Sequence, residues 1–435
     1  MKHPIQKILE KRKTGERVGI YSACSAHPYV LQAVIKRAKE TNSVAVIEST
    51  TNQVNQFGGY TGMLPADFAD MVKTIVKKND FPMERLILGG DHLGPLIWTN
   101  EEAESAMKKS EELIRQYVMA GYTKIHIDTS MKLASDSKHD MLKTEVIAER
   151  GARLCAVAVE AYETLKQQNP NVTQPVYIIG SEVPIPGGIQ SDDGLHVTTP
   201  TDFQETVNSF KAAFDKHHIA KAWENIVGVV VETGVEFGDN TIYEYQPEKV
   251  QNLVATLKSY PNLCFEGHST DYQTKYHLKR MVADGIAILK VGPALTFAMR
   301  EALFALENIE KNVITDSGQW SNLTQVLEAE MLKEPKYWEN HYKGNEDIQK
   351  LARKYSYSDR IRYYMSHESV ESSIKVLEGN INRGNISLTL LSQFMPEQYK
   401  KVRANALKPL FGDLVIDKIA DCIDDYIYAI QDEAN

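Results

Sequence analysis

Short apolar, β-branched runs alternate with amphipathic helical patterns from residue 17 to about residue 305. This alternation is typical of parallel βα units, not of hairpins. Between the runs, stretches such as Glu101–Ala120 carry apolar residues at helical spacing. Eight near-regular repeats favour a closed (β/α)8 TIM barrel over an open sheet, because closure leaves no strand edge exposed. The eight predicted strands are Val18–Cys24, Val44–Thr50, Arg85–Asp91, Lys124–Ser130, Val176–Val183, Ile226–Thr233, Leu263–Ser269 and Ile286–Gly292.

The pattern changes after Gly292, where helical periodicity dominates as far as Asn435. Loop-forming Asp, Ser, Gly and Asn residues cluster at Asn312–Ser321. A barrel needs about 250 residues, so the 435-residue chain has room for one barrel and a sizeable addition. We therefore expect a barrel domain over residues 1–312 and a helical C-terminal extension over residues 313–435.

Polar residues stand at the ends of the predicted strands, which is where barrel enzymes carry their chemistry. Asp91 and His92 follow two glycines at the end of the third strand. In the fourth strand Lys124, His126 and Asp128 alternate with isoleucines and so share one face. Helices would cover the isoleucine face, which leaves the polar face inside the barrel. We expect a structural hydrogen-bond network for Lys124 and His126, and a functional role for Asp128 at the strand end.

The later strands bring more ionisable groups to the same rim. Glu182 ends the fifth strand, Glu232 and Glu236 follow the sixth, and Glu266 and His268 lie on one face of the seventh. Imidazoles and carboxylates converging on one rim form the ligand set of a divalent transition metal such as zinc or manganese. The alternative is a purely structural polar rim.

Two further interpretations of this rim stay open. Lys290 lies in an otherwise apolar strand, and burial there would favour a Schiff-base lysine. A buried lysine is more often an ion-pair partner, with Asp128 or Glu182 supplying the opposite charge. The glycines at Gly58–Gly62 and Gly187–Gly188 could cradle phosphate, but they match neither a P-loop nor a dinucleotide fingerprint. Mobile loop hinges are the alternative for these glycines.

Composition excludes several classes of protein. The chain is 43% hydrophobic and 25% charged, as in ordinary globular proteins, and no apolar run is long enough to span a bilayer. The N-terminus lacks the features of a secretory signal, and the four cysteines are far apart, as expected of reduced cytosolic thiols. A formal net charge of −9 opposes binding to nucleic acid. We expect a cytoplasmic protein that binds neither nucleic acid nor membrane.

The chain resembles the Z subunit family of D-tagatose-1,6-bisphosphate aldolase nearly from end to end. The motifs that carry the resemblance are CSAHP at Cys24–Pro28, TNQVNQFGGYTGM at Thr51–Met63, LGGDHLGP at Leu88–Pro95, KIHIDTSM at Lys124–Met131, EVPIPGG at Glu182–Gly188, GVEF at Gly234–Phe237, GHSTDYQT at Gly267–Thr274, ILKVGPALTFAMREA at Ile288–Ala302 and SDRIRYY at Ser358–Tyr364.

The resemblance implies a class II aldolase site, in which the histidine after the catalytic aspartate binds zinc. Asp91-His92 fits that pattern. The second ligand histidine of those enzymes is replaced near Glu236, and Glu266 stands in another histidine position with His268 two residues on. The implied metal ligands are His92, Glu236 and His268, with Glu182, Glu232 and Glu266 as substitutes. Zinc is the first choice of metal, and manganese, nickel and cobalt are alternatives.

The resemblance also implies two functions. One is a ketohexose 4-epimerase that interconverts tagatose and fructose by breaking and remaking C3–C4. The other is a noncatalytic Z subunit that supports a separate catalytic Y subunit. The ligand is a ketohexose or its phosphate, and we expect a homo-oligomer. The expected catalytic residues are Asp91, Asp128 and Glu182, and the expected substrate contacts are Ser22, His27, Glu48, Asn52, Ser130, Glu232, Glu266, Asp271 and Lys290.

Overall fold

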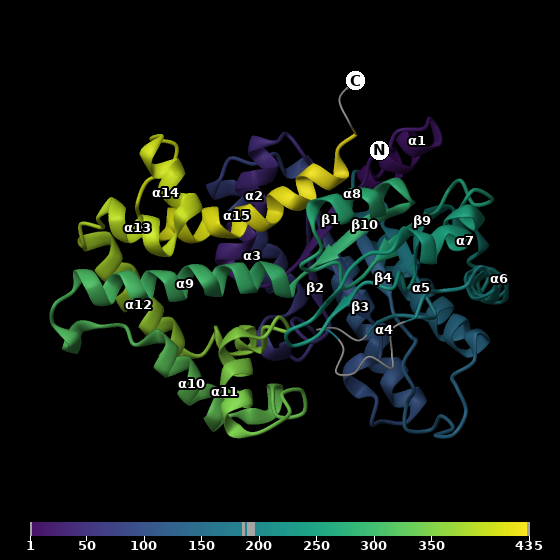
Figure 1. Cartoon of the computed structure of the whole chain (residues 1–435). Helices are drawn as coiled ribbons and strands as arrows, with labels where there is room; N and C mark the ends of the chain where they lie inside the picture. The colour runs from purple at the N-terminus through teal and green to yellow at the C-terminus, as the bar shows by residue number, and fades with distance from the viewer. Residues whose placement is uncertain (1, 185–187, 189–195, 433–435) are drawn as a thin grey trace.

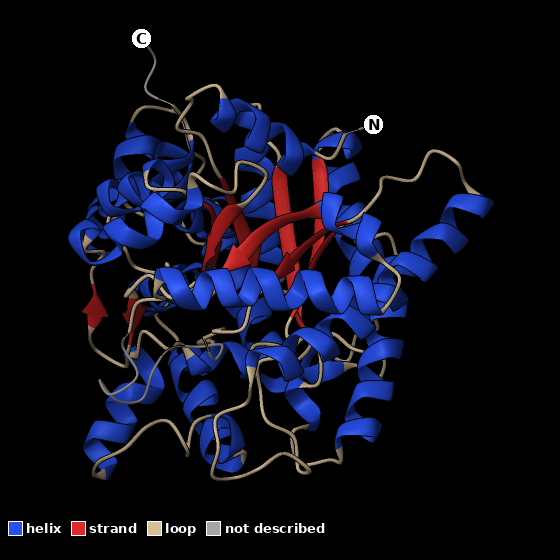
Figure 2. Ribbon diagram, turned by 90° about the vertical axis from the view of Figure 1, so that its right-hand side faces the viewer, coloured by secondary structure: helices blue, strands red, loops and turns tan. Residues whose placement is uncertain are grey.

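A closed barrel of eight parallel strands forms the centre of the molecule (Figures 1 and 2). The computed structural model describes residues 2–184, 188 and 196–432. Around the barrel the order is β1-β2-β3-β4-β5-β6-β9-β10, and β10 closes on β1. The strands are β1 (Ile20–Cys24), β2 (Ala45–Thr50), β3 (Leu86–Leu93), β4 (Lys124–Ile127), β5 (Val176–Ile179), β6 (Ile226–Val230), β9 (Cys264–Gly267) and β10 (Ile286–Val291). The predicted TIM-barrel fold is confirmed.

Each predicted strand overlaps an observed one, and β1 and β2 end where predicted, but the C-terminal ends of other strands differ. Strand β4 stops at Ile127, three residues before the predicted end, and β6 stops at Val230. Strand β3 instead continues past the predicted end to Leu93. A short antiparallel hairpin, β7 (Glu236–Phe237) with β8 (Ile242–Tyr243), follows β6 and was not predicted. The differences fall at the rim, where backbone that turns toward a cavity no longer follows the ladder pattern.

Helices surround the barrel as the alternating sequence pattern predicts. They are amphipathic, and their apolar faces pack with the outward-facing strand residues in one large core. The helices are α2 (Pro28–Glu40), α3 (Pro65–Lys78), α4 (Ala103–Met119), α5 (Thr144–Gln168), α6 (Pro200–Lys216), α7 (Pro247–Leu257), α8 (Lys275–Ala283) and α9 (Pro293–Val313). None of the helices among the described residues is both long and apolar enough to cross a bilayer.

The barrel interior is apolar at its N-terminal end. Helix α1 (Pro4–Lys13) closes that end, and its Ile5 and Leu9 pack with inward-facing residues such as Val46, Val176 and Ile288. The inward-facing polar residues of the strands lie above this apolar layer, toward the strand C-termini. The lower half of the barrel therefore serves stability, and the upper half is left for a polar site.

The C-terminal third is helical, as predicted. It contains α10 (Leu323–Lys333), α11 (Glu346–Tyr355), α12 (Glu368–Arg383), α13 (Leu388–Phe394), α14 (Pro396–Arg403) and α15 (Phe411–Ile430). Helix α15 returns along α9, α8 and α2, so this last helix packs against helices that surround the barrel (Figure 1). The exact division after residue 312 remains a prediction.

Gly94 lies where the rim of the barrel is tightly packed. A Cβ atom at this residue would lie 1.8 Å from the Asp128 carbonyl oxygen. We expect Gly94→Ala to lower the free energy of unfolding by about 2 kcal/mol or more, since the neighbouring strand end has to move. Gly379→Ala is the control, because its Cβ in helix α12 would meet nothing within 4 Å. That change should stabilise by about 0.5–1 kcal/mol. Urea denaturation measures both, and equal effects would show that the Gly94 contact is easily relaxed.

Candidate functional site

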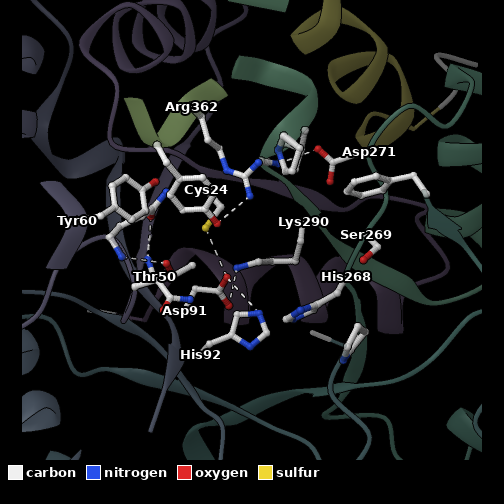
Figure 3. Close-up of a pocket in the computed structure, with 18 residues that line it drawn as sticks. Cys24, Thr50, Tyr60, Asp91, His92, His268, Ser269, Asp271, Lys290 and Arg362 are labelled. Atoms are coloured by element: carbon white, nitrogen blue, oxygen red, sulfur yellow. Dashed lines mark hydrogen bonds and ion pairs between the residues drawn. The ribbon is translucent and has the colours of Figure 1, made fainter. Parts of the chain in front are cut away.

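A polar cavity opens at the C-terminal end of the barrel (Figure 3). Residues of β3 and β10 and His268, which directly follows β9, form its floor, and residues of the C-terminal extension form part of its wall. The lining residues are Cys24, Thr50, Asn52, Gln53, Tyr60, Asp91, His92, Pro184, Phe237, His268, Ser269, Asp271, Lys290, Val291, Gly292, Pro293, Arg362 and Tyr363. The cavity therefore lies where barrel enzymes place their chemistry.

An irregularity in β3 turns both Asp91 and His92 toward this cavity. The pairing of β3 with β4 shifts register between Gly90 and Leu93, and His92 has a φ of 49°. Side chains on a regular strand point alternately to opposite faces, so two adjacent residues cannot both face inward without such a bulge. The bulge is thus what allows an aspartate and the next histidine to share one site.

Three imidazoles meet at this point. The ring centroids of His92, His126 and His268 are 4.9–5.1 Å apart, and all three rings are buried. One candidate ligand atom from each of them and one from Asp91 lie within 4.8 Å of one another. Among the described residues, three imidazole nitrogens thus lie close enough together to hold zinc or a similar transition ion, and the Asp91 carboxylate stands beside them.

Each imidazole is held by a carboxylate through one of its two nitrogens. His92 Nδ1 lies 2.8 Å from Asp128 Oδ2, and His268 Nε2 lies 3.1 Å from Glu266 Oε1. His126 Nδ1 lies 2.9 Å from Asp91 Oδ1. Metal-binding histidines are usually oriented by such carboxylates, which leave the other nitrogen as the ligand atom.

His126 gives the clearest sign that something belongs between the rings. Its Nδ1 lies within hydrogen-bonding distance of both the backbone N–H of His92, which points to it at 3.1 Å, and Asp91 Oδ1, at 2.9 Å. Its Nε2 is buried and has no hydrogen-bond partner among the described residues. A buried nitrogen without a partner is costly, and a metal ion would satisfy it. The donor set therefore fits a divalent transition ion.

Asp91 and His92 shift each other's pKa values. Burial alone would raise the pKa of Asp91, but the imidazoles of His92, His126 and His268 hold that pKa well below its ordinary value. Burial would lower the pKa of His92, yet the charge of Asp91 and the hydrogen bond that His92 donates to Asp128 raise that pKa to about 9. A metal ion at His92 therefore has to displace a proton, so metal affinity should fall at low pH.

A second layer of charges lies directly beneath. Lys124 Nζ is 2.6 Å from Glu48 and 2.7 Å from Glu266, and all three side chains are fully buried. Lys290 Nζ contacts Glu48 and lies 2.9 Å from Asp91. The sequence suggested Asp128 or Glu182 as the partner of Lys290, and the structure instead provides Glu48 and Asp91. Burial lowers the pKa of Lys290 to about 8, but the paired ammonium favours the ion-pair interpretation over a Schiff base.

The carboxylates after β5 and β6 form a separate group. Glu182 accepts a hydrogen bond from Thr198 Oγ1 at 2.5 Å and lies 3.0 Å from His196. Burial, Glu236 and Glu182 together raise the pKa of Glu232 to about 8. Burial raises the pKa of Glu236 to about 7, and its carboxylate accepts the Phe237 N–H. Among the described residues, Glu236 is not part of the donor group around the imidazoles.

The remaining predicted site residues occupy different places. Asn52 and Asp271 line the cavity, and Asp271 accepts the backbone N–H groups of Gly292 and Ala294. Ser130 Oγ donates to Asp128 at 2.7 Å and so supports the carboxylate behind His92. Ser22 is buried on β1 and His27 caps helix α2, and neither lines the cavity. The predicted loop glycine Gly187 lies outside the described residues.

Sequence reasoning missed several residues of the site. His126 was assigned to a structural network, although its strict alternation with Asp128 already placed it on the inward face. Cys24 donates its thiol proton toward Asp91 at 3.4 Å, and its position at the end of β1 was a usable signal. No sequence pattern indicated that Arg362 and Tyr363 return to the barrel mouth, because that contact depends on how the extension folds back.

The comparison with protein families gives a direct result. Residues 5–431 match the family model described as D-tagatose-1,6-bisphosphate aldolase subunit GatZ/KbaZ-like. The chain belongs to this family. The match spans both the barrel and the C-terminal helices of this GatZ/KbaZ-like protein, and it confirms the resemblance seen in the sequence.

Three solved structures resemble this chain to very different degrees. A probable tagatose 6 phosphate kinase from Sinorhizobium meliloti 1021 is 41% identical, with a TM-score of 0.85 over 94% of this chain and 100% of that one. The YdjI aldolase from Escherichia coli K12 is 15% identical, with a TM-score of 0.42 over 87% of this chain and 98% of that one. The fructose-bisphosphate aldolase from Campylobacter jejuni is 16% identical, with a TM-score of 0.43, covering 88% and 95%. The two aldolase likenesses are too weak to support a statement about fold or chemistry.

Two ligand sets are compared, His92 with His126 and His268, and His92 with Glu236 and His268. They predict opposite metal contents for variants of His126 and of Glu236. We expect His126→Gln to reduce zinc affinity at least about tenfold, because it removes one donor of the group. Glu236→Gln is the matched control and should keep the metal, because Glu236 lies outside the group. Plasma mass spectrometry after dialysis at fixed free zinc measures both variants. Metal loss in Glu236→Gln with retention in His126→Gln would instead support His92, Glu236 and His268 as ligands.

Proposed function

We propose that this protein is a divalent-metal-dependent ketohexose enzyme that breaks and remakes the C3–C4 bond, acting as a tagatose/fructose 4-epimerase. The supporting observation is the grouping of Asp91 with three carboxylate-held imidazoles at the floor of the barrel cavity. Such a concentration of buried ionisable groups has a stability cost that a scaffold would not need. The GatZ/KbaZ-like family supports an aldolase-related role.

The metal is the first part of the proposal. His92, His126 and His268 are the residues that would hold it, with Asp91 beside them. A divalent ion bound there would supply Lewis-acid stabilisation of the negative charge that develops on the ketose oxygens when C3–C4 breaks. Imidazole-rich donor sets suit zinc, nickel or cobalt, whereas phosphoryl transfer relies on magnesium with oxygen ligands. The site therefore favours carbon–carbon chemistry over a kinase reaction.

Asp91 is the proposed acid/base for the C4 hydroxyl. Its Oδ1 is occupied, because His126 Nδ1 and Lys290 Nζ both lie 2.9 Å away. Among the described residues, the groups recorded near its Oδ2 are the weak thiol donor of Cys24 at 3.4 Å and His92 Nε2 at 3.8 Å. The carboxylate is ionised at neutral pH and lines the cavity, so Oδ2 is the atom that would take the proton.

The other charged residues position the imidazoles that lie beside Asp91. Asp128 fixes the ring of His92, Glu266 fixes that of His268, and Lys124 neutralises Glu266 from below. Asp128 therefore acts through His92 and not on the sugar. If the aldehyde fragment departs after C3–C4 breaks, the outcome is aldolase cleavage. If the fragment turns and re-adds through its other face, C4 is inverted. One set of residues thus serves both reactions.

A supporting subunit is the second candidate, because the matching family is described as an aldolase subunit. In that role the protein would stabilise a separate catalytic Y-type aldolase. The buried donor group would then hold a structural ion or none, and replacing Asp91 would not affect the activity of the mixture.

Asp91→Asn separates the two candidates. Asparagine keeps the shape but cannot accept the proton, so we expect kcat to fall by roughly 10²-fold or more while zinc content stays unchanged. Turnover of fructose, tagatose and their phosphates by the isolated protein is followed by chromatography of the products.

The same assay, repeated with a Y-type aldolase present, tests the supporting role. Activity that appears only in the mixture and is unaffected by Asp91→Asn would assign the supporting role. Near-normal turnover by isolated Asp91→Asn would remove Asp91 from the mechanism, and borohydride trapping of a sugar on Lys290 would replace it with the Schiff-base route.

A further inference from the structure

A second cavity lies next to the one that contains the imidazoles. Its volume is about 220 Å³, compared with about 90 Å³ for the first. The two cavities share four lining residues, Cys24, Gln53, Tyr60 and Arg362. The shared residues therefore form the passage between the reacting site and the larger space beside it.

Arg362 reaches this passage from the C-terminal extension (Figure 3). It lies in the short 3-10 helix Arg360–Tyr364, which follows Asp359 in the left-handed conformation with a φ of 45°. Asp359 accepts hydrogen bonds from Thr296 at 2.6 Å and Arg300 at 3.3 Å, both on α9. Because α9 directly follows β10, this turn is fixed to the same element that supplies the cavity floor.

The guanidinium of Arg362 is oriented by hydrogen bonds to uncharged oxygen atoms. Nη1 donates to the carbonyl oxygens of Ser358 and Asp359, and Nη2 donates to the Tyr363 hydroxyl at 3.1 Å. Among the described residues, no carboxylate forms an ion pair with it. These bonds use three of the five N–H donors of an arginine, so Nε–H and one Nη2–H are left for a ligand.

The other cation of the cavity wall differs in this respect. Lys290 is paired with Glu48 and Asp91, so its charge is already balanced. Tyr60 and Tyr363 stand beside Arg362, with their ring centroids 4.7 Å apart and the guanidinium 4.6 Å over the Tyr363 ring. A rigidly held arginine that has no ion-pair partner among the described residues and lies beside the Tyr363 hydroxyl is a site for a planar or tetrahedral oxyanion.

We propose that Arg362, with Tyr60 and Tyr363, binds an anionic terminal group of the sugar, a phosphate ester or a carboxylate, and so makes the protein selective for acidic ketoses. This inference rests on the proposed function for the identity of the sugar, but the anion site itself does not. The sugar carbons would lie in the first cavity over Asp91, and the charged end would lie at the passage to the second. The C-terminal extension is then part of the substrate site.

Arg362→Gln removes the charge, and Arg362→Lys keeps the charge but loses the fork geometry. Arg383→Gln is the control, because this exposed arginine on α12 bonds only to its own helix at Gly379 and Asn380. Binding of inorganic phosphate and of acetate is measured by thermal shift, together with KM for fructose and for fructose 6-phosphate. The melting temperatures without ligand show that each variant is folded.

We expect phosphate or acetate affinity to fall by about 10- to 100-fold in Arg362→Gln, to be partly retained in Arg362→Lys and to be unchanged in Arg383→Gln. Stronger binding of phosphate than acetate assigns a phosphate ester, and the reverse assigns a sugar acid. KM should rise by a similar factor for fructose 6-phosphate and not for fructose if the anion is phosphate.

Two results separate this inference from the proposed function. Anion binding that depends on Arg362 without any sugar turnover would uphold the anion site and contradict the epimerase. Turnover of both sugars with anion affinity and KM unchanged in Arg362→Gln would uphold the epimerase and overturn the anion site.

Discussion

Charge balance inside the barrel is the constraint on which the site depends. Lys124 lies between Glu48 and Glu266, and Lys290 lies between Glu48 and Asp91, all of them buried. Removing one charge from such a network would leave another unpaired in a medium of low dielectric constant. The network therefore fixes Asp91 and Glu266, which in turn orient His126 and His268. Lys124 and Lys290 thus hold the reacting groups in position and need not react themselves.

Two features of the backbone make room for this network of charges. Gly89 leaves space for the Glu48 side chain, because a Cβ at that residue would lie 2.6 Å from Glu48 Cγ. The bulge after Gly90 then turns Asp91 and His92 inward together. The local sequence that produces this arrangement is a pair of glycines followed by an aspartate and a histidine. The helical extension adds Arg362 from outside the barrel, so residues of the extension complete the cavity wall.

Much of the fold followed from the sequence, because alternating strand and helix periodicities report directly on βα units. All eight strands were placed, and the inward face of β4 followed from its strict alternation. The site was harder to predict. His92 and His268 were expected to meet and do, but the third ring is His126, which the sequence placed on the inward face of β4 and for which we expected a structural network. The bulge that turns His92 inward beside Asp91 cannot be recognised from periodicity. The ion pair of Lys290 with Glu48 could not be predicted, because it depends on the register of β10 against β1 and β2. The return of Arg362 depends on tertiary packing of the extension.

The central claim is that this barrel breaks and remakes C3–C4 of a ketohexose, and the fate of the hydrogen on C4 tests it most directly. Zinc-loaded protein is incubated with D-fructose deuterated at C4, and separately with its 6-phosphate, and the products are followed by deuterium NMR. Cleavage of C3–C4 leaves the C4–H bond intact, so the account predicts tagatose or its phosphate with deuterium retained at C4. Release of the deuterium to water, or no inversion and no cleavage of either sugar, would contradict it.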